Sequence, residues 1–259
     1  SRGSILFVEK RTGTSVQVAL GSFGATRYDA ILAPAEYDIR LIGNPDLCKS
    51  PGNTIPCISG TIKKGFRLTS SGVLDLDLAS VAVQGSITVS GGAAPTGNDA
   101  DIASITFRRV EDSAVSTSLL GTFLHPYKVV LLTGTYDILY NAPGSRCSRT
   151  SSVPCVSGRI KAGVEFSTSG VFDIDIPTVK VSGRVTVNGQ PAMSGDTSLG
   201  SLSFRRQAGV DGQTYAPAID TDALEPSSRI EPYQVTLLPG TYDVRFVPKS
   251  PTCQSTVPC

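Results

Sequence analysis

Gly134-Thr135-Tyr136-Asp137-Ile138 decides the fold, because this stretch occurs three times in the chain. It returns as Ala35-Glu36-Tyr37-Asp38-Ile39 and as Gly240-Thr241-Tyr242-Asp243-Val244, with steps of 99 and 106 residues between the tyrosines. A second stretch, Cys57-Ile58-Ser59-Gly60-Thr61-Ile62-Lys63, returns 98 residues later as Cys155-Val156-Ser157-Gly158-Arg159-Ile160-Lys161. Such a period exceeds the ~20–50 residues of a solenoid turn and fits one sandwich domain. The repeat therefore predicts a tandem array of sandwich modules.

Alternating apolar and polar residues predict strands throughout the chain. Residues 81–89 and 179–187 both place valine or isoleucine at every second position except the central one, which is typical of half-buried strands. Gly85 and Gly183 take the central inward position, which indicates a bulge or a close approach of another backbone. Asn188-Gly189 then predicts a tight turn. Helical patterns are nearly absent, so the fold class is all-β, with antiparallel two-sheet sandwiches.

A strand pair follows in each repeat. Residues 127–131 and 135–139 are expected to form a hairpin around Leu132-Thr133-Gly134. The third copy of this turn reads Leu238-Pro239-Gly240. Proline fixes one corner of a type II turn and glycine supplies its positive φ, so Gly240 is expected in that conformation.

Three modules of this size account for the chain. We place a partial sandwich at 1–78, a complete one at 79–176 and a third, without its C-terminal strand, at 177–259. Only two to four residues link neighbours near Ala79 and Pro177, so a restricted angle is expected. Because open sheet edges invite pairing, either the native chain continues or a partner supplies the missing strands.

Six cysteines form three close pairs, one in each module. Their spacing and the presence of a single histidine do not fit a zinc site. We expect three disulfides that close short loops, with unpaired buried thiols as the alternative, and disulfides imply an extracellular or periplasmic location. The expected pairs are Cys48 with Cys57, Cys147 with Cys155, and Cys253 with Cys259.

Composition excludes several classes of partner. The formal net charge is +1 and charged residues are 17% of the chain, without a basic block. No attraction to nucleic acid or to an anionic membrane follows from such a balance. No apolar run is long enough for a transmembrane helix, and no signal peptide is recognisable at Ser1. Either an export signal has been removed or the chain is an excerpt.

The chain resembles the carboxypeptidase regulatory-like domain, and the match covers the strand framework of all three modules. Residues 181–191 match the family's opening strand and Asn-Gly turn, and residues 237–244 match its Leu-Pro-x-Gly-x-Tyr segment. This resemblance implies a transthyretin-type sandwich, found in tandem in bacterial surface proteins, and collagen-adhesin stalk domains are related to it. The cysteine loop departs from the family pattern, and no zinc peptidase domain accompanies the modules. Stalk domains can carry Lys–Asn isopeptide bonds, but Lys63 and Lys161 lack a recurring acid and amide partner.

Two Asp-x-Asp pairs are the main candidates for chemistry. Both carboxylates of a pair project to one face of a strand near a module boundary, where calcium could stiffen the array. The plainer interpretation is that they form the solvent face of a strand whose other face is buried. Two such carboxylates also lie ~7 Å apart, as in inverting glycosidases, but no cleft is indicated. The pairs are Asp75/Asp77 and Asp173/Asp175.

Other recurring residues have structural interpretations. The repeated tyrosines are expected to be buried, with the hydroxyl holding a corner, and the aspartates that follow them are expected to face solvent. Arg108-Arg109 and Arg205-Arg206 are interpreted as polar strand ends. His125 has no counterpart and no nearby cysteine, so a catalytic triad is not indicated. We expect no enzymatic activity and no cofactor.

The leading hypothesis is an extracellular structural protein, a disulfide-stapled stalk, fibre or appendage subunit. Its expected partners are copies of itself or further repeats of the same chain, joined end to end by strand complementation. The alternative is a tandem binding module that recognises surface polysaccharide or protein through its variable loops. A third hypothesis is the non-catalytic part of a secreted hydrolase.

Overall fold

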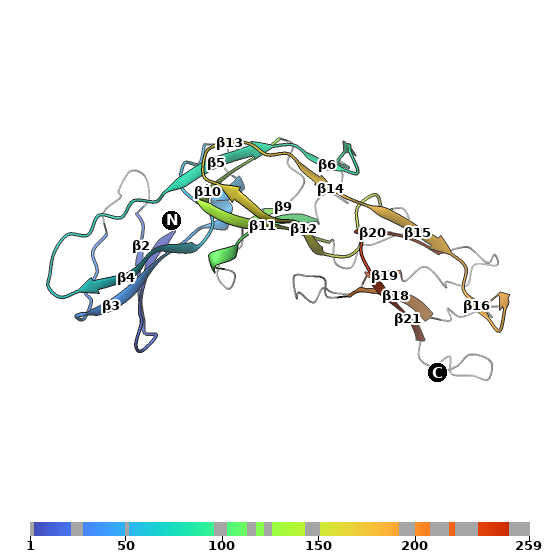
Figure 1. Cartoon of the computed structure of the whole chain (residues 1–259), viewed down its shortest axis with the longest axis horizontal. Coiled ribbons are helices and arrows are strands. Elements are labelled where there is room, and N and C mark those ends of the chain that lie inside the picture. The colour runs from blue at the N-terminus through green and yellow to red at the C-terminus, as the bar shows by residue number, and fades with distance from the viewer. Residues whose placement is uncertain are drawn as a thin grey trace.

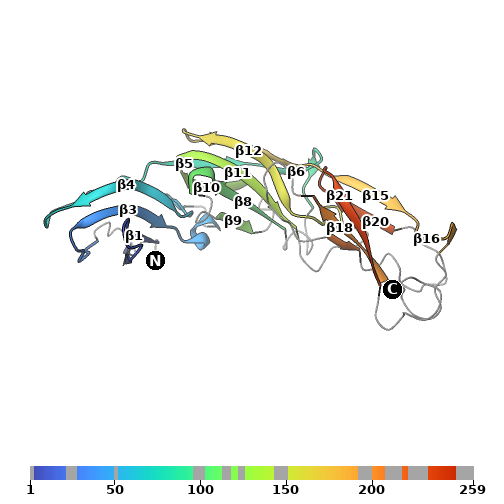
Figure 2. The same cartoon turned by 60° about the horizontal axis from the view of Figure 1, so that its bottom comes forward.

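The computed structural model is all-β and elongated (Figure 1). It describes residues 3–21, 28–49, 52–95, 103–112, 118–121, 126–142, 151–191, 200–207, 218–220 and 233–248. The hydrogen-bonded sheets form three groups in chain order, which we call the first (3–78), second (79–176) and third (177–248) sheet groups. The groups follow one another along the molecule in both views (Figures 1 and 2). Whether each group folds independently, as a module with the proposed boundaries, stays a prediction.

The first sheet group contains one antiparallel sheet in the order β2-β1-β3-β4. Phe7, Ile39 and Leu41 alternate inward from its central strands and are almost fully buried. The elements of this group are β1 (Ser4–Glu9), β2 (Ser15–Ala19), β3 (Ala35–Ile42), the 3-10 helix η1 (Pro45–Lys49) and β4 (Gly60–Leu68).

The second sheet group is a two-layered sandwich. One layer has the order β12-β11-β8-β9, and the other contains β10-β5-β13 and β14-β6-β7. Phe107 and Tyr127 bring the layers together with their ring centroids 6.2 Å apart. The elements are β5 (Ser80–Gly85), β6 (Ile87–Val89), β7 (Gly92–Ala93), β8 (Ser104–Arg109), the 3-10 helix η2 (Val110–Asp112), β9 (Ser118–Gly121), β10 (Tyr127–Leu132), β11 (Gly134–Asn141), β12 (Gly158–Phe166), β13 (Gly170–Val171) and β14 (Ile174–Ile176).

The third sheet group repeats parts of this plan. Its sheets have the orders β15-β20, β16-β17 and β19-β18-β21. The expected tight turn is present between β16 and β17, where Asn188 and Gly189 both have positive φ, at 53° and 78°. The elements are β15 (Val179–Gly183), β16 (Thr186–Val187), β17 (Gln190–Pro191), β18 (Gly200–Arg206), β19 (Ala218–Asp220), β20 (Tyr233–Leu237) and β21 (Tyr242–Pro248).

Not every strand is antiparallel, which corrects the sequence prediction. The Asp-x-Asp segment of the second group forms β13 and β14, which pair in parallel with β5 and β6. The equivalent segment of the first group, residues 73–78, is also expected to be a strand but has no strand pairing. In the second group this segment pairs with β5 and β6, and the described residues of the first group include no counterpart of those two strands.

The expected hairpin around Leu132-Thr133-Gly134 is a second correction. β10 pairs with β5, whereas β11 pairs with β8 and β12, so the turn is a corner that carries the chain from one layer to the other. The Tyr136 hydroxyl donates to the Leu132 carbonyl at 2.7 Å, and Tyr242 donates to Leu238 at 2.6 Å. Tyr37 holds the Ala33 carbonyl in the same way at 2.8 Å. The predicted hydrogen bond of the three tyrosine hydroxyls is therefore confirmed. Tyr37 and Tyr136 are also buried as expected, whereas Tyr242 is only half-buried.

The glycine of this corner leaves room for an arginine side chain, and its backbone differs between the copies: Gly134 has a positive φ of 147°. Gly240 does not have positive φ, contrary to the prediction. Instead, a Cβ at Gly240 would lie 2.8 Å from Nε of Arg206, and one at Gly134 would lie 2.7 Å from Nε of Arg109. Both glycines leave room for an arginine side chain that crosses the corner.

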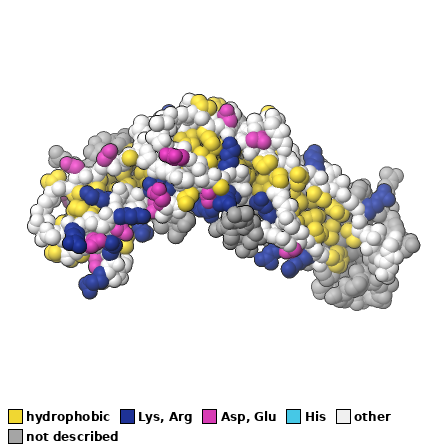
Figure 3. Space-filling view, viewed as in Figure 1, with side chains coloured by type: hydrophobic (Ala, Val, Ile, Leu, Met, Phe, Trp, Pro, Cys, Tyr) yellow, Lys and Arg dark blue, Asp and Glu magenta, His cyan; other side chains and the backbone are white. Residues whose placement is uncertain are grey.

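Charges are mixed over the visible face of the molecule. Lys and Arg side chains alternate with Asp and Glu over the first and second groups, while apolar side chains are more prominent over the third (Figure 3). Within the described residues, no helix has the length and apolar character needed to cross a membrane.

Candidate functional site: the joints between sheet groups

The first joint lies where the cysteine loop of the first sheet group meets the second group. The Cys57 amide donates to the Val130 carbonyl on β10 at 3.2 Å. At the start of β4, the Thr61 amide donates to Oδ2 of Asp112 at 2.9 Å, and the Thr61 hydroxyl donates to Oδ1 at 2.7 Å. Nη1 of Arg109 donates to the Thr61 carbonyl at 3.0 Å. The backbone of one group is thus held by the side chains of the next.

Asp112 and Arg109 supply the electrostatics of this joint. Their charged atoms lie 2.9 Å apart, and their side chains are only 8% and 12% exposed. Burial opposes ionisation of Asp112, but the hydrogen bonds from Thr61 and the charge of Arg109 outweigh it, so the pKa of this carboxyl lies below its ordinary value. The carboxylate is therefore the form that closes the joint.

The second joint uses the corresponding positions of the repeat. The Cys155 amide donates to the Thr236 carbonyl on β20 at 2.7 Å, and the Thr236 hydroxyl returns a bond to the Ser151 carbonyl at 2.7 Å. Thr236 is 1% exposed, so this exchange is sealed from water. Buried hydrogen bonds of this kind hold two surfaces in one register, because an unpaired polar group there would be costly.

Glycine permits the close approach at both joints. A Cβ at Gly60 would lie 2.8 Å from Cδ1 of Leu132, and one at Gly158 would overlap the Arg206 guanidinium and lie 2.9 Å from Cδ1 of Leu238. Arg206 is held in place by a hydrogen bond to the Pro239 carbonyl at 3.0 Å. Arg109 and Arg206, which the sequence pattern indicates as polar strand ends, therefore lie at the joints. The sequence offered one signal for this role: the Arg-Arg pair and the Ser-Gly dipeptide of the cysteine loop each occur in two copies of the repeat.

The first predicted disulfide is confirmed, and it lies on the loop that forms the first joint. Cys48 and Cys57 are bonded with a Cα–Cα distance of 5.3 Å, and both residues are buried. This disulfide closes the loop whose Cys57 amide contacts the second group.

The other two predicted disulfides reach beyond the part of the chain that the structure describes. Cys155 is disulfide-bonded, but its predicted partner Cys147 lies outside the described residues. Cys253 lies outside them as well, and so does Cys259, because the described part of the third group ends at Pro248. The disulfide expected between Cys253 and Cys259 therefore stays a prediction, in contrast to the one between Cys48 and Cys57.

The Asp-x-Asp pair of the second group holds a neighbouring strand. Asp173 accepts from the Ser86 amide at 2.8 Å. Asp175 accepts from the Thr88 hydroxyl at 2.7 Å and from the Gly91 amide at 2.9 Å. Both carboxylates therefore accept hydrogen bonds from the β5–β6 segment, which runs parallel to their own strand.

The pair in the first group, Asp75 and Asp77, has a different environment. Neither carboxylate accepts a hydrogen bond from any described residue. In the described part of the chain, no group of three or more His, Cys, Asp or Glu residues is arranged to hold a metal ion. The structure thus assigns the Asp-x-Asp motif a hydrogen-bonding role where its neighbour strand is present.

Asp137 corrects the expectation that the aspartates after the tyrosines face solvent. It is 7% exposed and pairs with Arg108 at 2.7 Å and with Arg159 at 3.4 Å. Its Oδ1 also accepts from the Gly163 amide at 3.2 Å, at a bulge of β12. Burial opposes ionisation, but these donors outweigh it and lower the pKa of Asp137. In the first group, Asp38 makes the matching bond to the Gly65 amide at 2.9 Å.

Other predicted residues have simple surroundings. Lys63 lies over the ring of Phe66 at 5.2 Å and Lys161 over that of Phe172 at 4.8 Å, so both make cation–π contacts. His125 lies outside the described residues.

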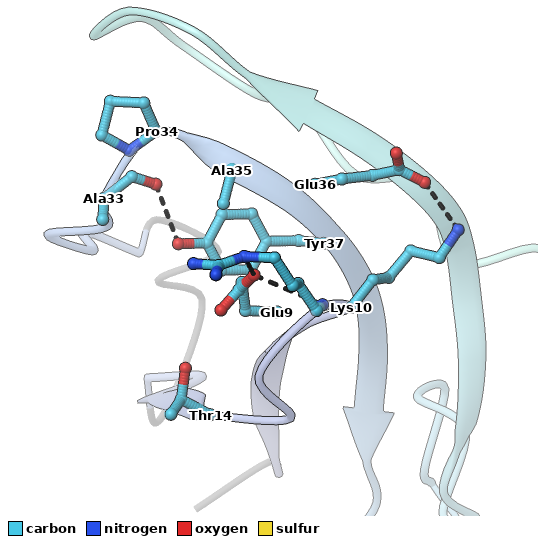
Figure 4. A pocket seen from close by; sticks show the side chains of 9 residues that line it. Glu9, Lys10, Thr14, Ala33, Pro34, Ala35, Glu36 and Tyr37 are labelled. Atoms are coloured by element: carbon cyan, nitrogen blue, oxygen red, sulfur yellow. Dashed lines mark hydrogen bonds and ion pairs between the residues drawn. The ribbon is translucent and has the colours of Figure 1, made fainter.

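A hollow of about 490 Å³ opens on the first sheet group (Figure 4). It is lined by Glu9, Lys10, Arg11, Thr14 and residues 33–37. Nζ of Lys10 lies 2.6 Å from Oε1 of Glu36, and this contact raises the pKa of Lys10. The charged groups of the hollow are thus engaged with one another.

The hollow corresponds in the repeat to the receiving side of a joint. Glu9 takes the position of Arg109, and Ala33 takes that of Leu132. The arginine and the leucine that contact the preceding cysteine loop at the two joints are therefore replaced here, and the same joint chemistry is not repeated.

Comparisons with known proteins give little further information. No family model and no curated protein matches the sequence. Among solved structures, the chain is similar to a proposed carbohydrate-binding protein from Bacteroides uniformis, with 14% identity over 61% of this chain and 79% of the other, and a TM-score of 0.27. It is also similar to a streptococcal ancillary pilin, with 10% identity over 96% of this chain and 85% of the other, and a TM-score of 0.25. At these TM-scores neither likeness carries an argument, and the resemblance to carboxypeptidase regulatory-like domains stays a prediction.

Proposed function

We propose that this chain is an extracellular structural protein, a stiff stalk or appendage subunit whose function depends on its elongated shape. The observation that carries the proposal is the repeated joint, in which the Cys57 amide of the first sheet group and the Cys155 amide of the second each donate a hydrogen bond to the following group. The same proposal assigns the chain no enzymatic activity and no cofactor.

Three features support a stiff connection between the groups. The joint between the first two groups combines backbone bonds with a largely buried ion pair, Arg109–Asp112. The linker at Ala79 is also held, because its carbonyl accepts from the Thr133 amide at 2.9 Å. Linkers this short cannot act as flexible tethers. Bending at the joint would therefore break several bonds at once.

The location follows from the same loops. The Cys48–Cys57 disulfide favours an oxidising compartment, since such bonds are rare in the cytosol. A disulfide also limits the conformations of the loop that carries the Cys57 amide to β10. We therefore propose that the disulfides stiffen the joints as well as stabilise each sheet group.

Single-particle imaging of the full chain tests the proposal. We expect rods with one narrow distribution of angles between successive sheet groups, and thread-like assemblies at high concentration. Small-angle scattering in solution should agree with the same elongated shape. Particles with a broad distribution of angles, or chains that remain single and bind a glycan array, would contradict the proposal.

A further inference from the structure

Two segments of the second sheet group lie side by side and run in the same direction. The chain enters this group through β5 and β6, and it leaves the group through β13 and β14. β13 pairs in parallel with β5, and β14 pairs in parallel with β6. Both segments follow the long axis of the molecule (Figure 1). The entering and leaving segments are therefore neighbours, although bonded residues such as Ser86 and Asp173 are 87 positions apart in the sequence.

This arrangement decides how a pull along the array loads the second group. The chain reaches the first sheet group from the start of β5 at Ser80, and it reaches the third group from the end of β14 at Ile176. A pull on the two neighbouring groups therefore draws the parallel segments past each other in opposite directions. Because the hydrogen bonds of a sheet run between its strands, sliding strains many of them together, whereas peeling strains them one after another.

Backbone hydrogen bonds connect the two segments along most of their length. They begin near the entry of the chain and continue to its exit, so a sliding motion strains all of them. The bonds run from Phe172 N to Gln84 O (2.8 Å), from Ile174 N to Ser86 O (2.9 Å) and from Ser90 N to Ile176 O (3.0 Å).

The two carboxylates of the Asp-x-Asp pair add bonds between the same segments. Asp173 accepts from the Ser86 amide at 2.8 Å. Asp175 accepts from the Thr88 hydroxyl at 2.7 Å and from the Gly91 amide at 2.9 Å. Hydrogen bonds to a charged acceptor are stronger than those between neutral groups. The motif therefore reinforces the contact that a pull along the array strains.

Hydroxyl side chains secure both ends of the paired segments. Near the entry of the chain, the Ala82 amide donates to Oγ of Ser169 at 2.9 Å. Near its exit, the Thr178 amide donates to Oγ of Ser90 at 3.0 Å, and the hydroxyls of these two residues lie 2.7 Å apart. The last residues before the third sheet group are thus fastened to the segment through which the chain entered the second.

We propose that the second sheet group bears tension along the array, and that residues 80–91 and 169–178 form the clamp that resists it. Before the group can lengthen, the clamp has to lose most of its bonds at one time. The Asp-x-Asp motif then serves resistance to extension, which is a separate property from stiffness against bending at the joints. The inference rests on the proposed function, because a stalk or appendage subunit is the kind of protein that is pulled from both ends.

The direction of pulling tests the inference in the unmodified clamp. Handles for optical tweezers are attached to the full chain through bioorthogonal residues at exposed positions beside the clamp. Handles at Ala79 and Lys180 slide the two segments past each other, whereas handles at Ala79 and Ser167 peel them apart from one end. We expect the sliding direction to require the higher unfolding force at the same loading rate. Equal forces, or a lower force for sliding, would overturn the inference.

Variants of the clamp give the size of the effect. Thr88→Val removes one donor to Asp175, and Asp175→Ala removes the acceptor of two bonds. Forced unfolding is governed by the unfolding rate. With handles at Ala79 and Lys180 under constant force, we expect this rate to rise about fivefold in Thr88→Val and roughly 30-fold in Asp175→Ala, as the loss of one and of two hydrogen bonds predicts. Unchanged rates would refute the clamp.

Tyr136→Phe is the matched control. It removes a hydrogen bond of the same sheet group outside the clamp, the one to the Leu132 carbonyl. A contact that is still intact when the clamp ruptures contributes to stability without affecting the unfolding rate. The rate under force should therefore stay that of the unmodified chain, and a rise equal to that of Thr88→Val would contradict the inference.

The outcomes separate this inference from the proposed function. Molecules with a narrow distribution of angles between sheet groups, but with equal unfolding forces in both pulling directions, would refute the clamp alone. Molecules with a broad distribution of angles and a higher force for sliding would refute only the stiff stalk.

Discussion

Asp112→Ala is the sharpest test of the joint between the first and second sheet groups. The change removes the acceptor of both Thr61 hydrogen bonds and the partner of Arg109, in a place where the two charged side chains are 8% and 12% exposed. Breaking a buried ion pair costs about 3–5 kcal/mol. Because this joint borders on solvent, we expect Asp112→Ala to destabilise the closed joint by about 2–3 kcal/mol. This loss corresponds to a roughly 30- to 150-fold increase in the population of molecules whose joint is open.

Amide hydrogen exchange at Cys57 measures this opening. The Cys57 amide bonds to Val130 across the joint and is not itself a partner of Asp112. Its protection should therefore fall by roughly 30- to 150-fold in Asp112→Ala. Glu111→Ala is the matched control, because Glu111 contacts the same Arg109 but is 54% exposed, and an exposed pair contributes about 0–1 kcal/mol. Equal protection of Cys57 in the two variants would refute the reasoning.

The same joint should respond to acid. The pKa of Asp112 is lowered in the folded protein from an ordinary value of 3.8, so its contribution is complete above that value. The contribution is lost as the pH falls through the lowered pKa and the carboxyl becomes protonated. Cys57 protection should therefore decrease below about pH 4, and Asp112→Asn should abolish this dependence. A dependence that persists in the variant would assign it to another group.

Three further predictions concern stability. Gly85→Ala should lower the free energy of unfolding by roughly 1–3 kcal/mol, because the new Cβ would overlap the backbone of Phe172. The control Gly72→Ala, which has open space around it, should change the free energy of unfolding by less than about 0.5 kcal/mol. Equal effects of the two variants in chemical denaturation would contradict this prediction. Tyr136→Phe should cost about 1 kcal/mol, the worth of its bond to the corner carbonyl, and an unchanged denaturation midpoint would remove that role. Replacing Cys48 and Cys57 with serine should cost about 2–3 kcal/mol in a thermal unfolding experiment, and a variant as stable as the unmodified chain would show that the staple contributes nothing.

Local patterns in the sequence predict the strands but not always their partners. Alternation over residues 81–89 correctly places β5 and β6, because burial of one face is a property of the strand itself. The corner at Leu132 resembles a hairpin in sequence, since the same turn residues serve a hairpin and a crossover between layers. Which strand lies beside β10 depends on β5, which precedes it by more than 40 residues. Turn chemistry alone does not contain that information.

The residues of the joints are hidden in the sequence for a similar reason. Arg109 contacts a carbonyl 48 residues earlier in the chain, and Asp137 is buried because Arg108 and Arg159 arrive from two neighbouring strands. The turn pattern predicts a special φ for Gly240, although the space it leaves for Arg206 is the physical requirement. Each of these roles arises from a contact between segments that are distant in the sequence, so the pattern within one segment does not predict it.

The joint also has a bearing on how such a chain could grow. Its two sides differ: the cysteine loop at the end of one group inserts, and the arginine-bearing corner of the next receives. A unit such as residues 79–176 carries both halves, one at each end. Duplicating its coding segment in tandem would place the Cys155 loop beside a second Arg109 corner. The backbone bond from the cysteine amide could then be repeated in the longer molecule, whereas the Thr61–Asp112 bonds of the first joint could not, because Arg159 takes the position of Thr61.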